Sequence, residues 1–379
     1  MQNTSTLDVQ PILADIARLA PQARSQRYMT KEVMELLTRA GLFRAMLPRK
    51  FGGLELTPTA FFRALIELAE SDMSAGWIGG VVGIHPFQIA LMGDAALTDV
   101  YGESPDVRVS SSYNPSGSKT VTTSEGLLLS GRWAWSSGCH HSDWLLLGAV
   151  QEGDMLLSTC LVPMSACRIE DTWNTMGLQG TGSNDIVIDE PVLVPRHRIH
   201  RQMDGFNGVH SQEGAMYSIP WGQLFAGCVA VPSIGAARHA LKVFSANSNP
   251  STVDVSKLHG DPDILRRVAE ASALIGETQT AFLGNIEGLV ETVERGETVS
   301  QLERARCRYF TGSIVSNMIK AVDLLFDAAG GRSVFSGAEI QNIWHDIHIT
   351  RAHVANNPVP LARNYGNMLL GGETRDYFM

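Results

Sequence analysis

Hydrophobic residues in the first hundred positions recur every three to four residues, which is the spacing of amphipathic helices. Gly41 is a typical residue to end the first such helix, whose apolar face comprises Val33, Met34, Leu37 and Ala40. Thr57 and Pro58 are a favoured N-cap and first residue for the next helix. The first part of the chain is therefore predicted to be helical.

A long apolar stretch follows, and we expect a helix that opens at Ser74 and runs through Trp77 and His85. The stretch 76–93 is nearly uncharged, which makes it a candidate for a membrane span. It contains the polar residues His85 and Gln88, however, and these indicate a buried helix of a folded domain.

The pattern changes near Pro105. From Val107 to Val194, short segments rich in Val, Leu, Ser and Thr alternate with turn residues such as those at 114–117. This spacing predicts about six to eight antiparallel strands, and hence a small sandwich or barrel.

Helical spacing returns in the last third of the chain. Residues 261–263 form a typical helix start, and apolar positions then keep a three-four spacing as far as Val293. Residues 305–329 and 340–355 are predicted to form two more helices. The polar stretch 247–260 breaks the pattern and is expected to be an exposed loop.

We therefore expect an α+β protein, mostly α, with three domains. Residues 1–104 are predicted to form an N-terminal helical domain, and residues 105–212 a central antiparallel β-domain. Residues 213–379 are predicted to form a C-terminal four-helix bundle.

Charge and composition narrow the possible classes of function. The net charge is −9 and no run of Lys or Arg occurs, which argues against nucleic-acid partners and against docking on an anionic membrane. The five cysteines form no CxxC pair and are odd in number, which favours a reduced protein. The N-terminal stretch carries Asp8 and Asp15 and lacks a basic start, so no signal peptide is expected. We expect a cytoplasmic location.

Two histidine pairs are candidate metal ligands, and neither is favoured. His345 and His348 lie about one helical turn apart, but no glutamate-bearing partner motif accompanies them. His140 and His141 are adjacent, and neighbours on an extended segment point to opposite faces. No metal site is therefore predicted. The sequence also lacks a P-loop and a GxSxG motif.

The strongest chemical signal is the segment 131–144. Trp133 and Trp135 stand beside Ser136 and Ser137 in a predicted strand-turn-strand junction. Large aromatic faces next to small hydroxyl groups suit a planar, polar heteroaromatic ligand, although a tryptophan-rich sandwich core is an alternative.

This segment resembles the flavin-contacting turn of the acyl-CoA dehydrogenase superfamily, and more closely that of its monooxygenase branch, the oxygenase components of two-component flavin-dependent hydroxylases. Residues 176–185 and 194–198 are similar to another signature of the superfamily, and residues 41–53 and the pair Gly330-Gly331 fit as well. The resemblance covers nearly the whole chain.

The resemblance implies an acyl-CoA dehydrogenase-like fold and a homotetramer, with flavin held between the β-domain and the bundle, partly by a neighbouring subunit. The monooxygenase branch uses reduced flavin (FADH2 or FMNH2) from a separate NAD(P)H:flavin reductase. With O2 it forms a C4a-hydroperoxyflavin and hydroxylates a small aromatic or heteroaromatic substrate, phenol- or indole-like. The implied flavin-binding residues are Trp135, Ser136, Ser137, Ser111, Asn114, Gly330 and Gly331.

One absence separates the monooxygenases from the dehydrogenases. A dehydrogenase of this superfamily needs a glutamate to remove an α-proton from an acyl-CoA. The two stretches where relatives carry it, 344–356 and 221–224, contain none. An acyl-CoA dehydrogenase-like FAD oxidoreductase is thus the less favoured reading, as is a non-catalytic subunit that only binds reduced flavin.

The resemblance also implies the catalytic residues. Ser137 is placed at flavin N5, and His353 is expected to be the base on the substrate side, because histidine titrates near working pH. His85 is expected to orient substrate or peroxide, and Trp77, His85 and His353 to line the substrate site. The plainer alternatives are that His85 is a core histidine, that His353 caps a helix and that Trp77 only packs.

Overall fold

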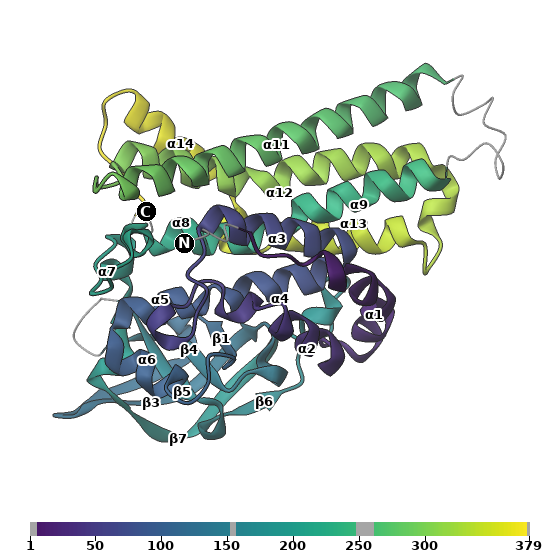
Figure 1. Cartoon of the computed structure of the whole chain (residues 1–379). Helices are drawn as coiled ribbons and strands as arrows, with labels where there is room; N and C mark the ends of the chain where they lie inside the picture. Colours follow the sequence, from purple (N-terminus) through teal and green to yellow (C-terminus); the bar gives the residue numbers. More distant parts are fainter. Residues whose placement is uncertain (1–5, 152–156, 248–260, 377–379) are drawn as a thin grey trace.

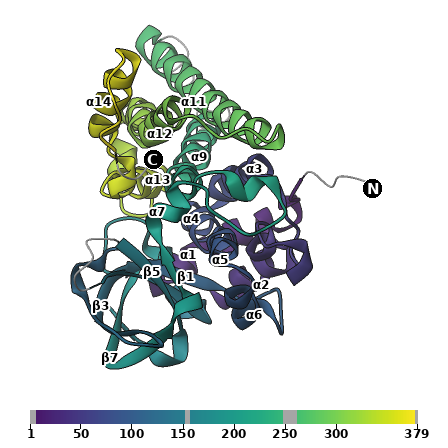
Figure 2. The ribbon, with the colours of Figure 1, turned by 90° about the vertical axis from the view of Figure 1, so that its left-hand side faces the viewer.

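The computed structural model describes residues 6–151, 157–247 and 261–376. In Figure 1, the long helices of the C-terminal part form the upper layer and the strands lie at the bottom, with helices α3 and α4 between them. Figure 2 shows that the remaining N-terminal helices stand beside the strands, beneath the bundle. The chain therefore has an N-terminal helical part, a central β part and a C-terminal bundle, as the sequence predicts.

The N-terminal part comprises α1 (Leu13–Gln26), α2 (Lys31–Arg39), α3 (Pro58–Ser71), α4 (Met73–Gly83), α5 (His85–Met92) and α6 (Asp94–Tyr101). The predicted cap of α3 is confirmed, because the Thr57 hydroxyl accepts a hydrogen bond from the backbone N–H of Ala60 at 3.3 Å.

The helix predicted from Ser74 through His85 is wrong in two details. Asp72 is its N-cap, with a carboxylate that accepts from the N–H of Ala75 at 2.8 Å. The helix also ends at Gly83, and His85 begins a second helix. Pro86 explains the break, because proline lacks the N–H that a continuous helix would require and its ring crowds the preceding turn.

The β part contains two four-stranded sheets, with strand orders β1-β4-β5-β8 and β2-β3-β7-β6. Their bounds are β1 (Val109–Ser112), β2 (Ser118–Thr122), β3 (Gly126–Ser136), β4 (Trp144–Val150), β5 (Leu157–Pro163), β6 (Arg168–Glu170), β7 (Asn184–Pro195) and β8 (Ile199–Arg201). Within the described residues, the number and the two-sheet arrangement agree with the sandwich that the turn spacing predicts.

One pairing differs from the antiparallel prediction, because β1 and β4 are parallel. The chain leaves β1, forms β2 and β3 in the other sheet, and only then returns as β4. A tight hairpin would force an antiparallel pair, whereas this route through the second sheet does not.

The bundle comprises α8 (Trp221–Ala230), α9 (Pro232–Asn247), α11 (Pro262–Glu294), α12 (Gln301–Ala329), α13 (Glu339–Thr350) and α14 (Pro358–Leu369), after a short α7 (Gln202–Phe206). The Asp261 start of α11 is confirmed, since its carboxylate accepts from the N–H of Ile264 at 3.3 Å. Residues 248–260 of the predicted exposed loop lie outside the described residues.

Two predicted helix ends are wrong. Helix α12 begins at Gln301, four residues early, because Ser300 and Glu303 form a reciprocal capping box. The last predicted helix stops at Thr350 and does not continue to 355. His353 therefore follows the helix and does not lie on it.

Two stretches are long and apolar enough to cross a membrane, Met73–Met92 and Trp221–Ala246. Inside the protein, 94% and 78% of their most apolar windows are buried. The first agrees with the prediction of a buried apolar stretch, here divided between α4 and α5.

Candidate active site

The end of strand β3 turns Trp135 outward. The pairing of β3 with β7 shifts between Trp133 and Ser136, and Trp135 has a φ of 67°. A positive φ is unfavourable for a bulky residue and persists only where the surroundings impose it. As a result Trp133 is fully buried while the Trp135 indole is 65% exposed. Trp133 is thus the core tryptophan, and Trp135 is the one available to a ligand.

Ser137, directly after this bulge, is hydrogen-bonded on two sides. Its Oγ accepts from Trp77 Nε1 of α4 at 3.1 Å and lies 2.7 Å from Ser183 Oγ. Ser183 Oγ in turn lies 2.7 Å from Thr181 Oγ1, which donates to the carbonyl of Leu178 at 2.8 Å. We call Ser137, Ser183 and Thr181 the hydroxyl relay.

The direction of the hydroxyl relay follows from its two ends. A carbonyl only accepts and an indole N–H only donates, while each hydroxyl has one proton. Thr181 gives its proton to the Leu178 carbonyl, so Ser183 donates to Thr181 and Ser137 donates to Ser183. Ser137 Oγ, which also accepts from Trp77, therefore keeps one lone pair to accept a further hydrogen bond.

The other predicted flavin-binding residues of the β part, Ser136, Ser111 and Asn114, differ in their hydrogen bonding and orientation. Ser136 Oγ is fully buried and pairs with Ser110 Oγ at 2.8 Å, inside the β part. Ser112 Oγ bonds the Ala134 carbonyl at 2.6 Å. Because side chains alternate along a strand, Ser111 of β1 faces the other way. Asn114 accepts from the N–H of Ser116 at 3.1 Å within its own exposed turn.

His85, the first residue of α5, is fully buried. Its Nδ1 lies 2.5 Å from the Val109 carbonyl, which can only accept, so the ring proton is on Nδ1. Nε2 then carries a lone pair, and it has no hydrogen-bond partner among the described residues. Burial lowers the pKa of His85 to about 4, so the ring is neutral and presents an acceptor.

His353 also presents Nε2, but in the opposite hydrogen-bonding role. It is the N-cap of a short 3-10 turn, Val354–Asn356, and its Nδ1 accepts from the N–H of Ala355 at 3.2 Å. The proton of the neutral ring is therefore on Nε2. Burial, with a smaller contribution from the charge of Arg308, lowers the pKa of His353 to about 4. In this state His353 donates, whereas a base must accept.

The turn that carries His353 is held from two sides. Arg308 of α12 donates to the Ala355 carbonyl at 3.1 Å, and Asn356 Nδ2 donates to the carbonyls of Val229 and Thr350 at 2.9 and 3.0 Å. The capping alternative for His353 is thus correct, and it coexists with an Nε2 edge that no described residue bonds.

A series of aromatic rings links Ser137, His353 and His85 into one arc. The Trp77 ring, bonded to Ser137, lies 6.0 Å from the His353 ring, which lies 6.2 Å from Phe225. Phe225 lies 5.0 Å from Tyr113, and Tyr113 lies 6.2 Å from His85. The structure therefore brings Trp77, Ser137, His353 and His85 to one region.

Gly330 and Gly331 are not part of this region in a single chain. They follow α12 and precede α13, which has twelve residues, and His353 lies beyond its far end. A helix of this length spans about 18 Å. Both glycines are exposed, and no atom lies within 4 Å of a Cβ built on either. Their predicted flavin contact stays a prediction, in which the resemblance assigns part of the flavin site to a neighbouring subunit.

Three of the four histidines in the two pairs have hydrogen-bond partners in the protein. His348 Nε2 lies 2.9 Å from Asp323 Oδ1, and His140 Nε2 lies 2.9 Å from Asn184 Nδ2. His141 Nε2 lies 2.7 Å from the Met29 carbonyl. Within the described ranges, no group of three or more His, Cys, Asp or Glu residues is placed to hold a metal ion.

Sequence reasoning missed four residues of the arc and the hydroxyl relay. Ser183 and Thr181 lie in the recognised stretch 176–185, but no role follows from their sequence position alone. Tyr113 directly follows β1, and its hydroxyl donates to Gln88 Oε1 at 2.6 Å. Phe225 lies one helical turn after Trp221, a spacing that places both on one face of α8.

These residues fit a flavin. Trp135 offers an exposed aromatic face, and the remaining lone pair of Ser137 suits a ring N–H such as N5 of a reduced flavin. The region contains neutral histidines and no catalytic glutamate at either stretch where a dehydrogenase would carry it. The fold and site thus define a flavoprotein with an acyl-CoA dehydrogenase-like fold and without the dehydrogenase base.

Comparison with known proteins identifies the family within this class. The family models "Acyl-CoA dehydrogenase, N-terminal domain" and "Acyl-CoA dehydrogenase, C-terminal domain" match residues 12–101 and 227–358. The flavin-dependent monooxygenase oxygenase subunit HsaA of Mycobacterium tuberculosis is 32% identical over 98% of both chains. The FADH(2)-dependent resorcinol hydroxylase, oxygenase component, of Rhizobium sp. is 29% identical over 97% of this chain and 94% of its own.

A solved structure agrees. The crystal structure of the M. tuberculosis HsaA monooxygenase superposes with a TM-score of 0.93 at 30% identity, with all of both chains covered. The chain belongs to the oxygenase components of flavin-dependent monooxygenases, within the acyl-CoA dehydrogenase superfamily. The resemblance seen in the sequence is confirmed, and the acyl-CoA dehydrogenase-like alternative is the less favoured one.

Proposed function

We propose that this oxygenase component hydroxylates a small phenolic ring, with His85 and His353 binding the substrate as acceptor and donor and Ser137 holding the flavin edge. Reduced flavin, when bound, activates O2 and supplies the oxygen atom that is transferred. The carrying observation is the opposite hydrogen-bonding state of the two histidines: Nδ1 of His85 is occupied as a donor, and Nδ1 of His353 as an acceptor.

A phenolic substrate matches these two edges. Phenolic hydroxyls can donate to Nε2 of His85 and accept from Nε2–H of His353, and a hydrogen bond that draws the hydroxyl proton away makes the ring more electron-rich for attack on an electrophilic oxygen. His85 is the residue that can accept a hydrogen bond from this hydroxyl, because its Nε2 is the free acceptor. Full proton transfer to it is disfavoured, since burial lowers the pKa of His85 to about 4. The predicted base role of His353 would require the other tautomer, in which Nδ1–H would face the N–H of Ala355.

Ser137 and its neighbours form the flavin side. Ser137 Oγ can accept from the flavin N5–H while Trp77 and Ser183 fix its orientation. Holding that proton in place and excluding water both favour oxygen transfer over release of hydrogen peroxide. The exposed indole of Trp135 offers the adjoining aromatic face.

Partners and assembly complete the proposal. The resorcinol hydroxylase relative is described as FADH(2)-dependent and as an oxygenase component, which supports a separate NAD(P)H:flavin reductase as the source of reduced flavin. We also propose a cytoplasmic homotetramer. Large apolar side chains on the described bundle surface that a neighbouring subunit would cover are Leu302, Phe310, Val354, Val359, Leu369 and Leu370. Light scattering that gives a single 41.1 kDa particle would contradict the tetramer.

The proposed activity is tested by mixing the protein, loaded anaerobically with FADH2 or FMNH2, with 18O2 and a panel of phenols and indoles. We expect one heavy oxygen atom in a hydroxylated phenol, detected by mass spectrometry. Stoichiometric hydrogen peroxide without labelled product, across the whole panel, would contradict the proposal and favour the subunit that only binds reduced flavin.

A further inference from the structure

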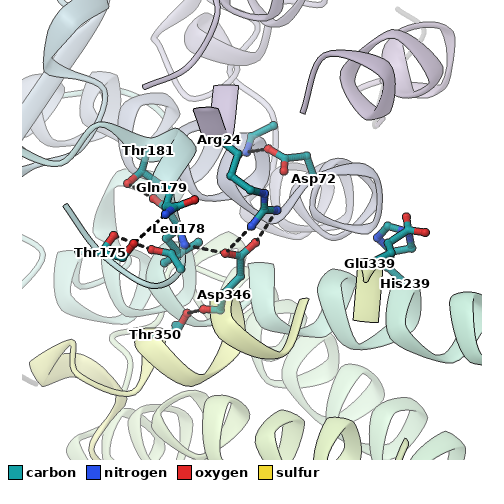
Figure 3. Close-up of polar contacts among 12 residues, drawn as sticks. Arg24, Asp72, Thr175, Leu178, Gln179, Thr181, His239, Glu339, Asp346 and Thr350 are labelled. Atoms are coloured by element: carbon teal, nitrogen blue, oxygen red, sulfur yellow. Dashed lines mark hydrogen bonds and ion pairs between the residues drawn. The ribbon is translucent and has the colours of Figure 1, made fainter. Parts of the chain in front are cut away.

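A buried ion pair lies behind the hydroxyl relay. Asp346 of α13 is 2% exposed, and its Oδ1 accepts from the backbone N–H of Leu178 at 2.6 Å. The Arg24 guanidinium of α1 faces the same carboxylate at 3.3 and 3.4 Å. Figure 3 shows Arg24, Asp346 and Leu178 converging from three separate segments. No catalytic role described above uses this pair.

Asp346 stabilises an unfavourable backbone conformation at Leu178. Leu178 has a φ of 50°, which is unfavourable for a residue with a side chain. Next to it, Gly177 approaches α13 so closely that a Cβ there would lie 2.4 Å from the His345 carbonyl oxygen. The loop is thus pressed onto α13, and the bond to Asp346 fixes Leu178 in its strained conformation.

The carbonyl of Leu178 is where the hydroxyl relay ends. It accepts from Thr181 Oγ1 at 2.8 Å and from Trp173 Nε1 at 2.9 Å. Thr181 then sets the direction of Ser183, and Ser183 that of Ser137. The N–H that Asp346 holds and the carbonyl that Thr181 bonds lie on either side of the Leu178 Cα. A change in the φ and ψ angles of Leu178 would therefore release Thr181 and remove the constraint that orients the Ser137 hydroxyl.

The second partner of Ser137 is held by a second buried carboxylate. Asp72 caps α4, the helix that carries Trp77. Burial and the charge of Asp346 raise the pKa of Asp72 to about 6, while the charge of Arg24 lowers it. Figure 3 places Asp72 next to Arg24, which also contacts Asp346. Arg24 therefore pairs with Asp346 directly and lies near Asp72, the carboxylate that caps the helix carrying Trp77.

We propose that Asp346 and Arg24 are positioning residues that hold the Ser137 hydroxyl in the orientation needed to accept from the flavin. Asp346 acts through Leu178, Thr181 and Ser183, and Arg24 acts by pairing with the buried Asp346 carboxylate. The proposal rests on the proposed role of Ser137, and it assigns no contact with substrate or flavin to either residue.

A double-mutant cycle tests the path, by which we mean the series of hydrogen bonds that connects Asp346 to Ser137. Asp346→Ala and Ser183→Ala should each raise hydrogen peroxide release per flavin oxidised by about tenfold. Because both break the same path, the double variant should release no more than either single variant, whereas independent effects would multiply to about a hundredfold. Asp327→Asn is the matched control, since Asp327 pairs with Arg267 at 3.0 Å on the surface, and it should behave as wild type.

Hydrogen exchange supplies a readout that needs no flavin. In the apoprotein, the peptide spanning residues 175–183 should exchange about tenfold faster in Asp346→Ala than in wild type. Asp346→Asn, whose amide oxygen can still accept from Leu178 N–H, should recover most of the protection but leave Arg24 unpaired. Arg24→Gln combined with Asp346→Asn should restore peroxide release toward wild type relative to Arg24→Gln alone.

The outcomes separate the two proposals. Multiplicative effects in the cycle, or wild-type exchange and coupling in Asp346→Ala, would overturn the positioning role. If no Asp346 variant folds, Thr181→Val decides, because it breaks the relay without touching the ion pair: wild-type coupling in Thr181→Val would overturn the path. Failure of wild type to hydroxylate any substrate would overturn the proposed function, while the exchange result would still report on the loop.

Discussion

The β side and the helical side of the site differ in how completely their polar atoms are hydrogen-bonded within the protein. On the β side, Ser137 Oγ is bonded to Trp77 and Ser183, and Ser183 to Thr181. On the helical side, Nδ1 of His85 and Nδ1 of His353 are bonded to backbone, and Nε2 of each has no partner among the described residues. Nε2 of His85 is buried, whereas His353 is half-buried. A buried polar atom without a partner is costly. The β side is therefore a fixed frame, and the helical side is where a substrate completes the hydrogen bonding.

Removing the acceptor on the helical side should have the largest effect. In His85→Asn, the side-chain amide can still donate to the Val109 carbonyl, but the Nε2 acceptor is lost. Product formation should fall by about a hundredfold, the upper end of what losing one hydrogen bond to a buried polar group costs, while reduced-flavin binding persists and peroxide replaces product. Rapid-quench product analysis measures this, with His348→Asn, outside the arc, as the control. Normal hydroxylation in His85→Asn would show that another residue accepts the hydrogen bond from the substrate.

The same buried histidine predicts a pH-dependent stability. The pKa of His85 is about 4 in the folded protein against an ordinary 6.5, so the unfolded chain binds a proton first as the pH falls. Stability should therefore decline between pH 6.5 and 4, by about 3 kcal/mol for this residue. Urea unfolding of wild type and His85→Asn at pH 7 and pH 4.5 measures the difference. Equal declines in the two proteins would mean that His85 is protonated in the folded state.

Breaking the frame on the β side should change coupling and leave substrate binding intact. Ser137→Ala removes the acceptor offered to flavin and leaves Trp77 Nε1 unpaired. Loss of such a hydrogen bond corresponds to about 1–3 kcal/mol, hence about ten- to a hundredfold faster peroxide release. Peroxide and product yields measure the split, and Ser116→Ala in the exposed turn is the control. Unchanged yields would place flavin N5 elsewhere.

The smallest expected effect distinguishes a donor from a base at position 353. In His353→Asn, the amide oxygen can still accept from Ala355 N–H, so the turn is kept and the Nε2–H donor is lost. A donor role predicts about a tenfold loss of product formation, with no recovery at high pH. A loss of about 10²–10⁴ that recovers as the substrate ionises would instead support the base role.

The sequence was informative where local chemistry decides the structure. Thr57 and Pro58 mark the start of α3, and Asp261 the start of α11, because capping needs only neighbouring residues. The turn spacing predicts the strands of the β part. It does not predict the parallel pairing of β1 with β4, which depends on the route of the chain through the second sheet.

The site was less accessible to sequence reasoning, because its hydrogen bonds join distant segments. Trp77 and Ser137 are sixty positions apart, and the partner of His85 Nδ1 is the backbone of Val109. The tautomer of His353 depends on where α13 ends, and the helical pattern alone extended that helix past it. Residue types were thus predictable, whereas proton positions required the structure.

The opposite tautomers of His85 and His353 are the central claim, and neutron diffraction from crystals grown in deuterated solution near pH 7 tests it most directly. We expect one deuteron on each ring, on Nδ1 of His85 facing the Val109 carbonyl and on Nε2 of His353, with Nδ1 of His353 bare toward Ala355. The same tautomer at both positions, or two deuterons on either ring, would contradict the division into one acceptor and one donor.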